Sequence, residues 1–482
     1  MPKNTRAKNR EKYAIIYAMD LEKRARRQSL KIITSEIIMV IAVIVTVIIL
    51  AFLVSGYWLG SDFKVERQGM LQIYSTPTGA NVAVDGDAPW FQRTNTSKVL
   101  ASGEHEIVLE KDGYDTWSRT INITEGLLYR VHYPRLFLKD REKSVAYDPE
   151  AIGAEIPTFA TVSPDYNSML LVNKTTTWTL LGLNREEIEA TPIDISTIFA
   201  NVSKVSGAKT GLFTGKILSA NWSNDNEHIL FKIGGDTTEW VVLNTKNPKN
   251  SVNLTREFAT DFDEVRIFDN SISTLFALRN HNLHKIDASN RQISAILAEN
   301  IESYDFYDSD LIYFSENKIF TGRLNDQKTT ILTEVDGDAE VRISRFYDEK
   351  YNFVISKHKV ELFKHENAEL VFEGEISFDP ETVKVGYGGS FIFIQNGMNV
   401  AVLDMEVMEL KEWRLDSLNS GWLDSNMLYV IKDGTLIVYD FDGGNRRELS
   451  TNVSAHFPVT ITDNKWLYYF SDNALTREII AK

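Results

Sequence analysis

Cysteine is absent from this chain of 482 residues. Its absence excludes a disulfide framework, a thiolate metal site, a thiol nucleophile and the attachment of a lipid to cysteine. Proline is scarce, with 11 residues, and glycine reaches only 26, which excludes a collagen-like or low-complexity chain. Positive charge is also in deficit, because 52 Lys and Arg face 67 Asp and Glu. The resulting net charge of −15 argues against nucleic acid as a partner, since phosphate contacts need a basic surface.

What is present indicates a globular protein of several parts. Hydrophobic residues make up 43% of the chain and aromatic residues 11%, which is the composition of a folded protein with a sizeable core. At roughly 150 residues per domain, the length predicts about three domains, or fewer if one of them is a large all-β unit.

A long apolar run lies near the N-terminus. Residues 37–61 contain no charged side chain, and residues 37–54 are apolar except for Thr46. A helix of that length reaches ~37 Å, enough to cross a ~30 Å hydrocarbon core. The run therefore predicts a transmembrane helix over residues 36–61 that contacts the lipid bilayer through residues 37–61, with Tyr57 and Trp58 as interfacial anchors. The alternative is a buried core segment.

Charge is divided unequally on the two sides of this run. Residues 1–31 carry ten Lys and Arg against three acids, a net +7, whereas the chain beyond the run carries about −21. By the positive-inside rule, residues 1–35 are predicted to be a cytoplasmic leader and the C-terminal domains to lie outside the cell membrane. A signal peptide cleaved near Ser55 is the competing interpretation, but the long basic leader and long apolar run favour an uncleaved anchor.

Short alternating runs follow the predicted span, from residue 66 to residue 139. Their apolar–polar alternation and the Gly and Asp residues between them predict a small antiparallel β-sandwich. The expected strands are residues 70–75, 81–84, 104–110, 117–123 and 129–137.

Within this segment, several spaced motifs resemble the PEGA domain family. They are the turn Pro77-Thr78-Gly79-Ala80, the hairpin Val82-Ala83-Val84-Asp85-Gly86, the pair Gly103 and His105, and Gly113-Tyr114. The sequence departs from the family at residues 88–94, where the usual Gly-x-Thr-Pro entry is degraded. The resemblance implies a surface-associated, non-catalytic module of a cell envelope. The glycines and Pro77 are interpreted as turn residues, and His105 as a hydrogen-bonded scaffold residue.

An internal repeat occupies residues 141–482. An apolar strand recurs eight times, each time preceded by a polar turn and followed by a second strand, with starts spaced 36 to 60 residues apart. A period near 40 with several short strands per unit is the signature of a β-propeller. The recurring apolar strands are residues 169–172, 229–231, 275–278, 311–314, 352–355, 391–394, 427–430 and 466–469.

The repeat count predicts eight blades, with seven as the alternative because residues 184–216 could hold an irregular unit. Ring closure would require a strand from residues 144–159 to complete the last blade. Residues 191–215 are expected to form a long exposed loop. The turns before the strands, such as Ser163-Pro164-Asp165 and Trp222-Ser223-Asn224-Asp225, resemble those of TolB-like and WD-repeat-like propellers. Their aspartates, like those of Asp440-Phe441-Asp442-Gly443, are interpreted as turn residues rather than calcium ligands.

No catalytic constellation is evident in the sequence. There is no Gly-x-Ser-x-Gly elbow, no His-Glu-x-x-His helix, no phosphate-binding loop and no dinucleotide fingerprint. The strand-spaced pair His281 and His284 lacks neighbouring carboxylates. The sequence therefore predicts no catalytic residues, no metal ligands, no cofactor and no enzymatic activity.

The order of the parts gives the expected function. The fold class is mainly β, with one N-terminal transmembrane helix (36–61), a PEGA-like sandwich (66–139) and a propeller (141–482). Together they predict a single-pass envelope protein that serves as a non-catalytic binding or assembly platform for envelope proteins or wall glycans. The alternatives are a propeller enzyme, a lyase or glycosidase acting on envelope polysaccharide, and a transmembrane sensor.

Overall fold

The computed structural model describes residues 35–48, 50–51, 57–59, 65–89, 92–184, 186–199, 202–203, 212–235, 237–268, 271–324, 329–366, 369–386 and 389–482. These residues are divided between two compact units. The first comprises the described residues within 1–73, 95–107 and 120–132, and the second those within 74–94, 108–119 and 133–482.

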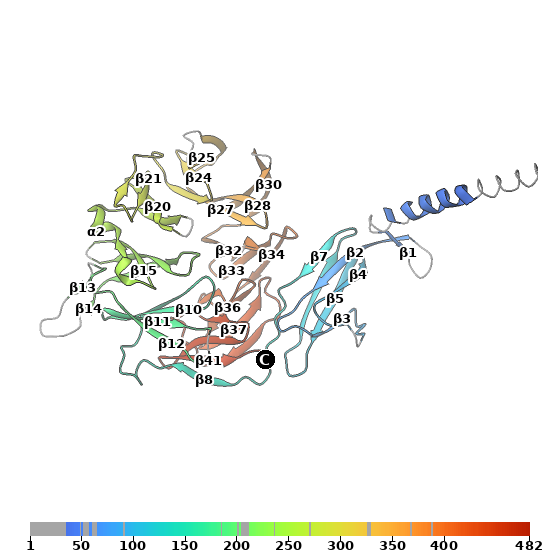
Figure 1. Cartoon of the computed structure of the whole chain (residues 1–482), viewed down its shortest axis with the longest axis horizontal. Coiled ribbons are helices and arrows are strands. Elements are labelled where there is room, and N and C mark those ends of the chain that lie inside the picture. Colours follow the sequence, from blue (N-terminus) through green and yellow to red (C-terminus); the bar gives the residue numbers. More distant parts are fainter. Residues whose placement is uncertain are drawn as a thin grey trace, which may run out of the picture. The chain divides into compact units, whose positions relative to one another are not determined.

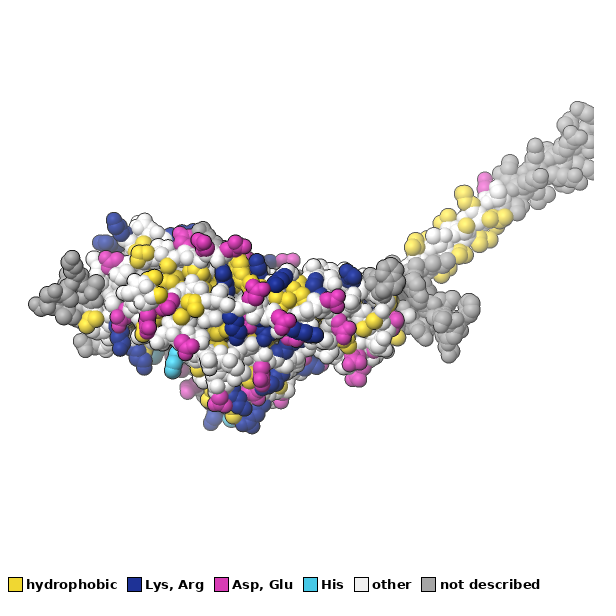
Figure 2. Space-filling model, turned by 90° about the horizontal axis from the view of Figure 1, so that it is seen from below, with side chains coloured by type: hydrophobic (Ala, Val, Ile, Leu, Met, Phe, Trp, Pro, Cys, Tyr) yellow, Lys and Arg dark blue, Asp and Glu magenta, His cyan; other side chains and the backbone are white. Residues whose placement is uncertain are grey.

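The first unit begins with a helical stretch, residues 35–48 and 50–51. Its apolar side chains are exposed, among them Ile44 at 52% and Ile48 at 56%, and Figure 2 shows hydrophobic atoms along this helix. Among the described residues, no helix is both long enough and apolar enough to cross a membrane. Residues 49, 52–56 and 60–61 of the predicted span lie outside the described residues.

The predicted helix is wrong at its far end, because Tyr57–Leu59 form strand β1. This strand pairs antiparallel with β2 (Val65–Ile73), in the register Trp58 opposite Glu66. Aromatic residues such as Tyr57 and Trp58 are common in β-strands. The end of the apolar run therefore forms a strand, because β2 is available to pair with it.

Two small sheets follow in the segment that resembles a PEGA domain. One has the order β1-β2-β4 with β7 also paired to β2, and the other has the order β3-β5-β6. The prediction that all pairing here is antiparallel is wrong, since β2 and β7 run parallel. Strand β4 is a further difference from the strands predicted above. The strands are β3 (Asn81–Val84), β4 (Thr96–Ala101), β5 (Gly103–Glu110), β6 (Trp117–Ile123) and β7 (Leu128–Val131).

The second unit contains eight four-stranded antiparallel sheets within the described part of residues 143–482. In each sheet the apolar strand of the sequence repeat is the second strand, and its predicted partner is the third. The first four sheets are β9 (Phe159–Val162), β10 (Ser168–Val172), β11 (Thr177–Gly182), β12 (Glu189–Asp194); β15 (Lys216–Trp222), β16 (His228–Gly234), β17 (Glu239–Asn244), β18 (Val252–Asn253); β19 (Glu264–Phe268), β20 (Ser271–Arg279), β21 (Asn282–Asp287), β22 (Gln292–Ile293); and β23 (Ser303–Tyr307), β24 (Asp310–Ser315), β25 (Lys318–Arg323), β26 (Thr329–Glu334).

The remaining four sheets repeat the same order, and the last one recruits a strand from the start of the repeat region. They are β27 (Ala339–Phe346), β28 (Glu349–Ser356), β29 (Lys359–Glu366), β30 (Glu369–Ser377); β31 (Thr382–Val385), β32 (Phe391–Asn396), β33 (Asn399–Asp404), β34 (Glu409–Arg414); β35 (Ser420–Trp422), β36 (Met427–Lys432), β37 (Thr435–Asp440), β38 (Arg447–Ser450); and β39 (Thr460–Thr462), β40 (Trp466–Ser471), β41 (Ala474–Ile479), β8 (Lys143–Tyr147).

The eight sheets form a closed ring (Figure 1). Neighbouring sheets bury apolar side chains against each other, as Trp178 of the first sheet does against Phe231 of the second, with ring centroids 5.6 Å apart. The last sheet packs on the first in the same way, since Tyr468 and Met169 belong to one buried cluster. Burial of both faces of each sheet by its neighbours is what allows such short strands to be stable. The part of the second unit within residues 143–482 is therefore an eight-bladed β-propeller.

The ring is closed by β8, a strand from the segment that was predicted to complete the last blade. β8 pairs antiparallel with β41 as the outermost strand of the last sheet. Glu478 of β41 is completely buried at this junction, where its carboxylate accepts a hydrogen bond from the Nε of Arg141 at 2.7 Å. Ser450 Oγ and the Tyr469 hydroxyl, at 3.2 Å, also bond Glu478. Paired with a guanidinium and hydrogen-bonded on both oxygens, this buried charge is compensated.

The expected long loop at residues 191–215 is wrong over its first part. Residues 191–194 belong to β12, which pairs with β11, and Ile198 and Phe199 are buried against Trp178. The apolar side chains among the polar residues of this stretch fill the space between the first two sheets. Two-residue strands β13 (Val202–Ser203) and β14 (Leu212–Phe213) pair further on, and residues 204–211 lie outside the described residues.

Candidate functional site

A hollow of about 490 Å³ opens among the first strands of the propeller sheets. Its walls include Asn221 of β15, Glu264 and Arg266 of β19, and Arg342 of β27. First strands of successive sheets lie next to one another, as β23 and β27 do. Side chains from separate blades therefore converge at this hollow.

The charges of this hollow are paired with each other. The Nε of Arg266 lies 2.7 Å from Glu264, and its Nη1 lies 2.8 Å from Asp305. The guanidinium also lies over the ring of Tyr304, 5.0 Å from its centroid. Burial lowers the pKa of Arg266, but the carboxylates of Asp305 and Glu264 outweigh it and hold that pKa above its ordinary value. The second oxygen of Asp305 accepts the backbone N–H of Ile343 at 3.0 Å. This network stabilises the junction of three blades.

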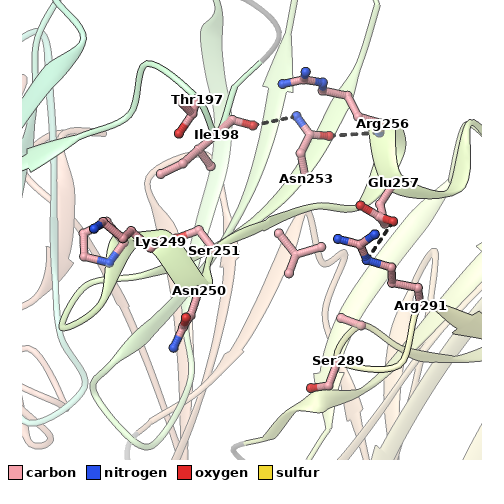
Figure 3. A pocket seen from close by; sticks show the side chains of 13 residues that line it. Thr197, Ile198, Lys249, Asn250, Ser251, Asn253, Arg256, Glu257, Ser289 and Arg291 are labelled. Carbon is pink, nitrogen blue, oxygen red and sulfur yellow. Dashed lines mark hydrogen bonds and ion pairs between the residues drawn. The ribbon is translucent and has the colours of Figure 1, made fainter.

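A second hollow, of about 770 Å³, lies where outer parts of the second and third blades meet (Figure 3). Five segments form its walls: the turn after β12, the short helix η1 (Pro248–Asn250), β18, the helix α2 (Leu254–Phe258) and the turn between β21 and β22.

The floor of this second hollow is fixed by a buried amide. Asn253 donates from Nδ2 to the carbonyl oxygen of Ile198 at 3.1 Å and to Glu239 at 3.2 Å. Its Oδ1 accepts the backbone N–H of Arg256 at 3.0 Å and so caps α2. An N-cap Asn satisfies a backbone donor that the helix itself leaves free. The segments that carry the surrounding side chains are thereby held in place.

Cationic side chains dominate the wall of the second hollow. Lys249 comes from η1, Arg256 from α2 and Arg291 from the turn after β21, whereas Glu257 is the one carboxylate among its described lining residues. The Nε of Arg291 lies 3.0 Å from Glu257. The remaining lining side chains are mostly small or hydroxyl- and amide-bearing, as for Thr197, Asn250, Ser251 and Ser289. The arrangement suits the binding of a hydrophilic anion.

None of these three cationic residues was predicted as a site residue. Lys249 and Arg256 lie in a basic stretch of an otherwise acidic region, which was an available signal. Arg291 is far from both along the chain, and only the packing of the blades brings it to the same hollow.

The residues considered as ligands in the sequence have structural partners instead. His281 and His284 direct their Nδ1 atoms to different backbone oxygens, those of Ile301 at 3.3 Å and Ser294 at 3.1 Å. His105 bonds the carbonyl of Ala101 at 2.9 Å, as its scaffold interpretation predicts. In the part of the chain that the structure describes, no group of three or more His, Asp or Glu side chains could hold a metal ion.

The turn aspartates bond their own turns. Asp225 accepts the backbone N–H of Glu227 at 2.7 Å and contacts Nδ1 of His228 at 2.6 Å. Burial raises the pKa of Asp225, but hydrogen bonds from Ser223, Glu227 and His228 more than offset this and lower it overall. The interpretation of these residues as turn formers is confirmed at this position.

Asp440, at the end of β37, is a buried exception within the second unit. It is 1% exposed and accepts hydrogen bonds at Oδ2 from Nε1 of Trp117 at 2.7 Å and Nδ2 of Asn445 at 2.9 Å. Its Oδ1 has no hydrogen-bond partner. Desolvation, and secondly the charge of Asp442, raise the pKa of Asp440 to about 7. The neighbouring Asp442 pairs with Arg119 at 3.1 Å. Both carboxylates thus contact side chains of residues 117–119.

Comparison with known proteins supports the assignment of the small sheets. Residues 68–135 match the PEGA domain. This is the segment in which the turn and hairpin motifs occur, so the PEGA resemblance is confirmed for that part of the chain. No curated protein sequence is significantly similar to the chain.

Several solved structures are similar to the chain at low sequence identity. The Dos1 propeller is 10% identical, covering 70% of this chain and 94% of its own, with a TM-score of 0.42. Hsv2 of Kluyveromyces lactis is 9% identical, covering 62% of this chain and 99% of its own, with a TM-score of 0.41. PorZ, a surface component of the type-IX secretion system of Porphyromonas gingivalis, is 12% identical over 68% of this chain and 42% of its own, with a TM-score of 0.37. Such low scores carry no argument about function.

Proposed function

We propose that the protein is a single-pass envelope protein whose PEGA domain and propeller form a non-catalytic binding or assembly platform for envelope proteins or wall glycans. The observation that carries the proposal is the closed eight-bladed ring, with two polar hollows whose walls are fixed by internal hydrogen bonds and ion pairs. Preformed hollows of this size are typical of ligand-binding sites. We also propose that the propeller is of the TolB-like and WD-repeat-like type.

The N-terminal part of the chain supports a membrane location. The helical residues 35–48 and 50–51 expose a continuous series of apolar side chains, and such a surface is stable only against lipid or another apolar partner. The leader of net +7 precedes it, and the remainder of about −21 follows it. This asymmetry favours an N-terminus in the cytoplasm and a C-terminal region outside.

The anchor can be tested by placing carboxylates in the helix. We expect the double variant Ile44→Asp and Ile48→Asp to leave the membrane fraction, because each Asp near the centre of a span opposes insertion by about 2.5–3.5 kcal/mol. Carbonate-washed membranes from cells that express the full chain would be assayed for the protein. The matched control, Ile44→Leu with Ile48→Leu, should remain in the membrane pellet.

Topology is measured in the same cells with tags at both ends. External protease applied to spheroplasts should remove a C-terminal tag and spare an N-terminal tag. Two results would contradict the proposed location. One is recovery of the chain without Asp substitutions in the soluble fraction. The other is protection of the C-terminal tag from protease in intact spheroplasts.

A further inference from the structure

We propose that the hollow lined by Lys249, Arg256 and Arg291 binds a carboxylate-bearing glycan. This inference deepens the platform function proposed above and rests on it, because it names the chemical class of one ligand and the site that holds it.

The first support is the local balance of charge. Three cationic side chains line the hollow against the single carboxylate of Glu257, so its local charge is about +2 in a protein whose net charge is −15. Arg291 is the cation that pairs with Glu257. Among the described residues, the side chains of Lys249 and Arg256 have no ion-pair or hydrogen-bond partner. Two cations are thus available to a ligand.

The overall negative charge does not prevent an anion from binding here. At physiological ionic strength the Debye length is about 8 Å, so distant carboxylates on the propeller surface are largely screened within the hollow. Of the nearer acids, Asp287 is bound through both oxygens by Asn290, at 2.9 and 2.8 Å. Glu239 is buried beneath the floor and bonds Asn253. These hydrogen bonds come from neutral groups and do not neutralise either carboxylate, but neither Asp287 nor Glu239 lines the hollow, whereas the three cations do.

The second support is the geometry of the walls. Arg256 and Arg291 come from different elements, α2 and the turn between β21 and β22. Figure 3 shows the Arg291 side chain beside Glu257, whereas the Arg256 side chain runs away from that pair, past Asn253. A guanidinium presents a planar set of donors that matches the two oxygens of a carboxylate. Because Asn253 bonds the backbone of both the turn after β12 and the start of α2, these backbone segments are held in place before a ligand binds.

The uncharged part of the lining favours a sugar over a peptide. Thr197, Asn250, Ser251 and Ser289 supply hydroxyl and amide groups, which can bond the hydroxyl groups of a saccharide. The apolar part of the described lining consists of Ile198, Pro248, Val252 and Ala288, without an aromatic, Leu or Met side chain. Ile198 and Ala288 are buried, so the hollow offers an apolar peptide side chain only a small surface. A volume of about 770 Å³ accommodates a ligand of a few sugar rings.

The test is a binding measurement on the full chain in detergent, with a galacturonic acid oligomer as the probe and a neutral maltose oligomer of equal length as its control. We expect the acidic oligomer to bind and the neutral one not to bind. The variant with Lys249, Arg256 and Arg291 all changed to Gln should bind at least about tenfold more weakly, since it can no longer form charge-assisted hydrogen bonds with the carboxylates of the ligand. Raising the salt from 0.15 to 0.5 M should weaken wild-type binding severalfold.

A matched variant controls for the loss of three positive charges. Lys357, Arg414 and Lys432 are exposed cations on other blades, and changing all three to Gln should leave binding within about twofold. Thermal melting of both variants confirms that they are folded. Equal binding by the wild type and the Lys249, Arg256 and Arg291 variant would overturn the assignment of the site.

The remaining outcomes also decide the inference. Equal binding of the neutral oligomer would overturn recognition by charge, and tighter binding of a poly-glutamate peptide would overturn the glycan class. Absence of any binding in detergent would refute this inference while leaving the membrane location intact, because fractionation tests that location separately. Conversely, a soluble wild-type chain that still bound the acidic oligomer would refute the location alone.

Discussion

Replacing Glu478 by Ala is expected to destabilise the propeller by about 3–5 kcal/mol, the usual cost of removing one partner from a buried ion pair. The carboxylate is fully buried and bonds Arg141, which precedes β8, as well as Ser450 and Tyr469. Without it, the Nε of Arg141 loses its partner at the junction where β8 closes the ring. Urea unfolding of the full chain in detergent, followed by tryptophan fluorescence, measures the loss.

The control for this substitution is Glu448→Ala. Glu448 forms an exposed ion pair with Arg446 at 3.1 Å, and such pairs contribute about 0–1 kcal/mol. Changing both Arg141 and Glu478 to Met should recover part of the stability, because no buried charge is then left unpaired. An unfolding midpoint of Glu478→Ala equal to that of Glu448→Ala would show that this contact does not hold the ring closed.

The second large effect expected is a dependence of stability on pH that comes from Asp440. Its pKa is raised to about 7 in the folded protein, whereas an Asp in an unfolded chain has a pKa near 3.9. Between these values the folded state binds more protons than the unfolded state. The contribution of Asp440 to folding stability is therefore largest below about pH 4 and is lost as the pH rises through 7.

Asp440→Asn should remove this dependence. An Asn at this position retains an oxygen that can accept from Nε1 of Trp117 and from Asn445, as Oδ2 of Asp440 does, but it has no charge to bury. Relative to the wild type, the variant should gain stability on going from pH 5 to pH 8, by an amount on the order of a few kcal/mol. Arg447, whose charge lowers the pKa of Asp440, reduces the effect.

Thermal unfolding at pH 5, 6, 7 and 8 measures this difference. Asp433→Asn, at an exposed position of a turn, is the control and should leave the pH dependence of the wild type unchanged. Parallel curves for the wild type and Asp440→Asn over this range would contradict the prediction.

Much of the propeller could be predicted because each repeat leaves a local signal. The second strand of every sheet is buried on both faces, as Met169, Leu170 and Leu171 are, so it must be a continuous apolar run. A turn with Asp or Asn precedes it for backbone reasons that are equally local. Counting these runs predicts the number of blades, and the missing fourth strand at the C-terminal end predicts that an earlier segment such as β8 closes the ring.

Other features were missed because they depend on partners that are distant in sequence. The run ending at Tyr57 and Trp58 reads as helix until β2 is available to pair with it. The parallel pairing of β2 with β7 follows from the path of the chain, not from alternation of residues. Ile198 and Phe199 lie in a stretch that appears polar on average, yet they fill a cavity formed by Trp178 and Phe231.

By itself, the sequence determined that this protein is mainly β, that a PEGA-like segment and an eightfold repeat follow an apolar run, and that charge is divided about that run. Periodicity, turn chemistry and charge are properties of neighbouring residues and need no knowledge of the fold. Only the tertiary structure decided which charges meet: Arg141 with Glu478, Arg266 with Asp305, and Lys249 and Arg256 with Arg291 at one hollow. These groups come together through the stacking of whole sheets, and that stacking is driven by apolar burial elsewhere in each blade.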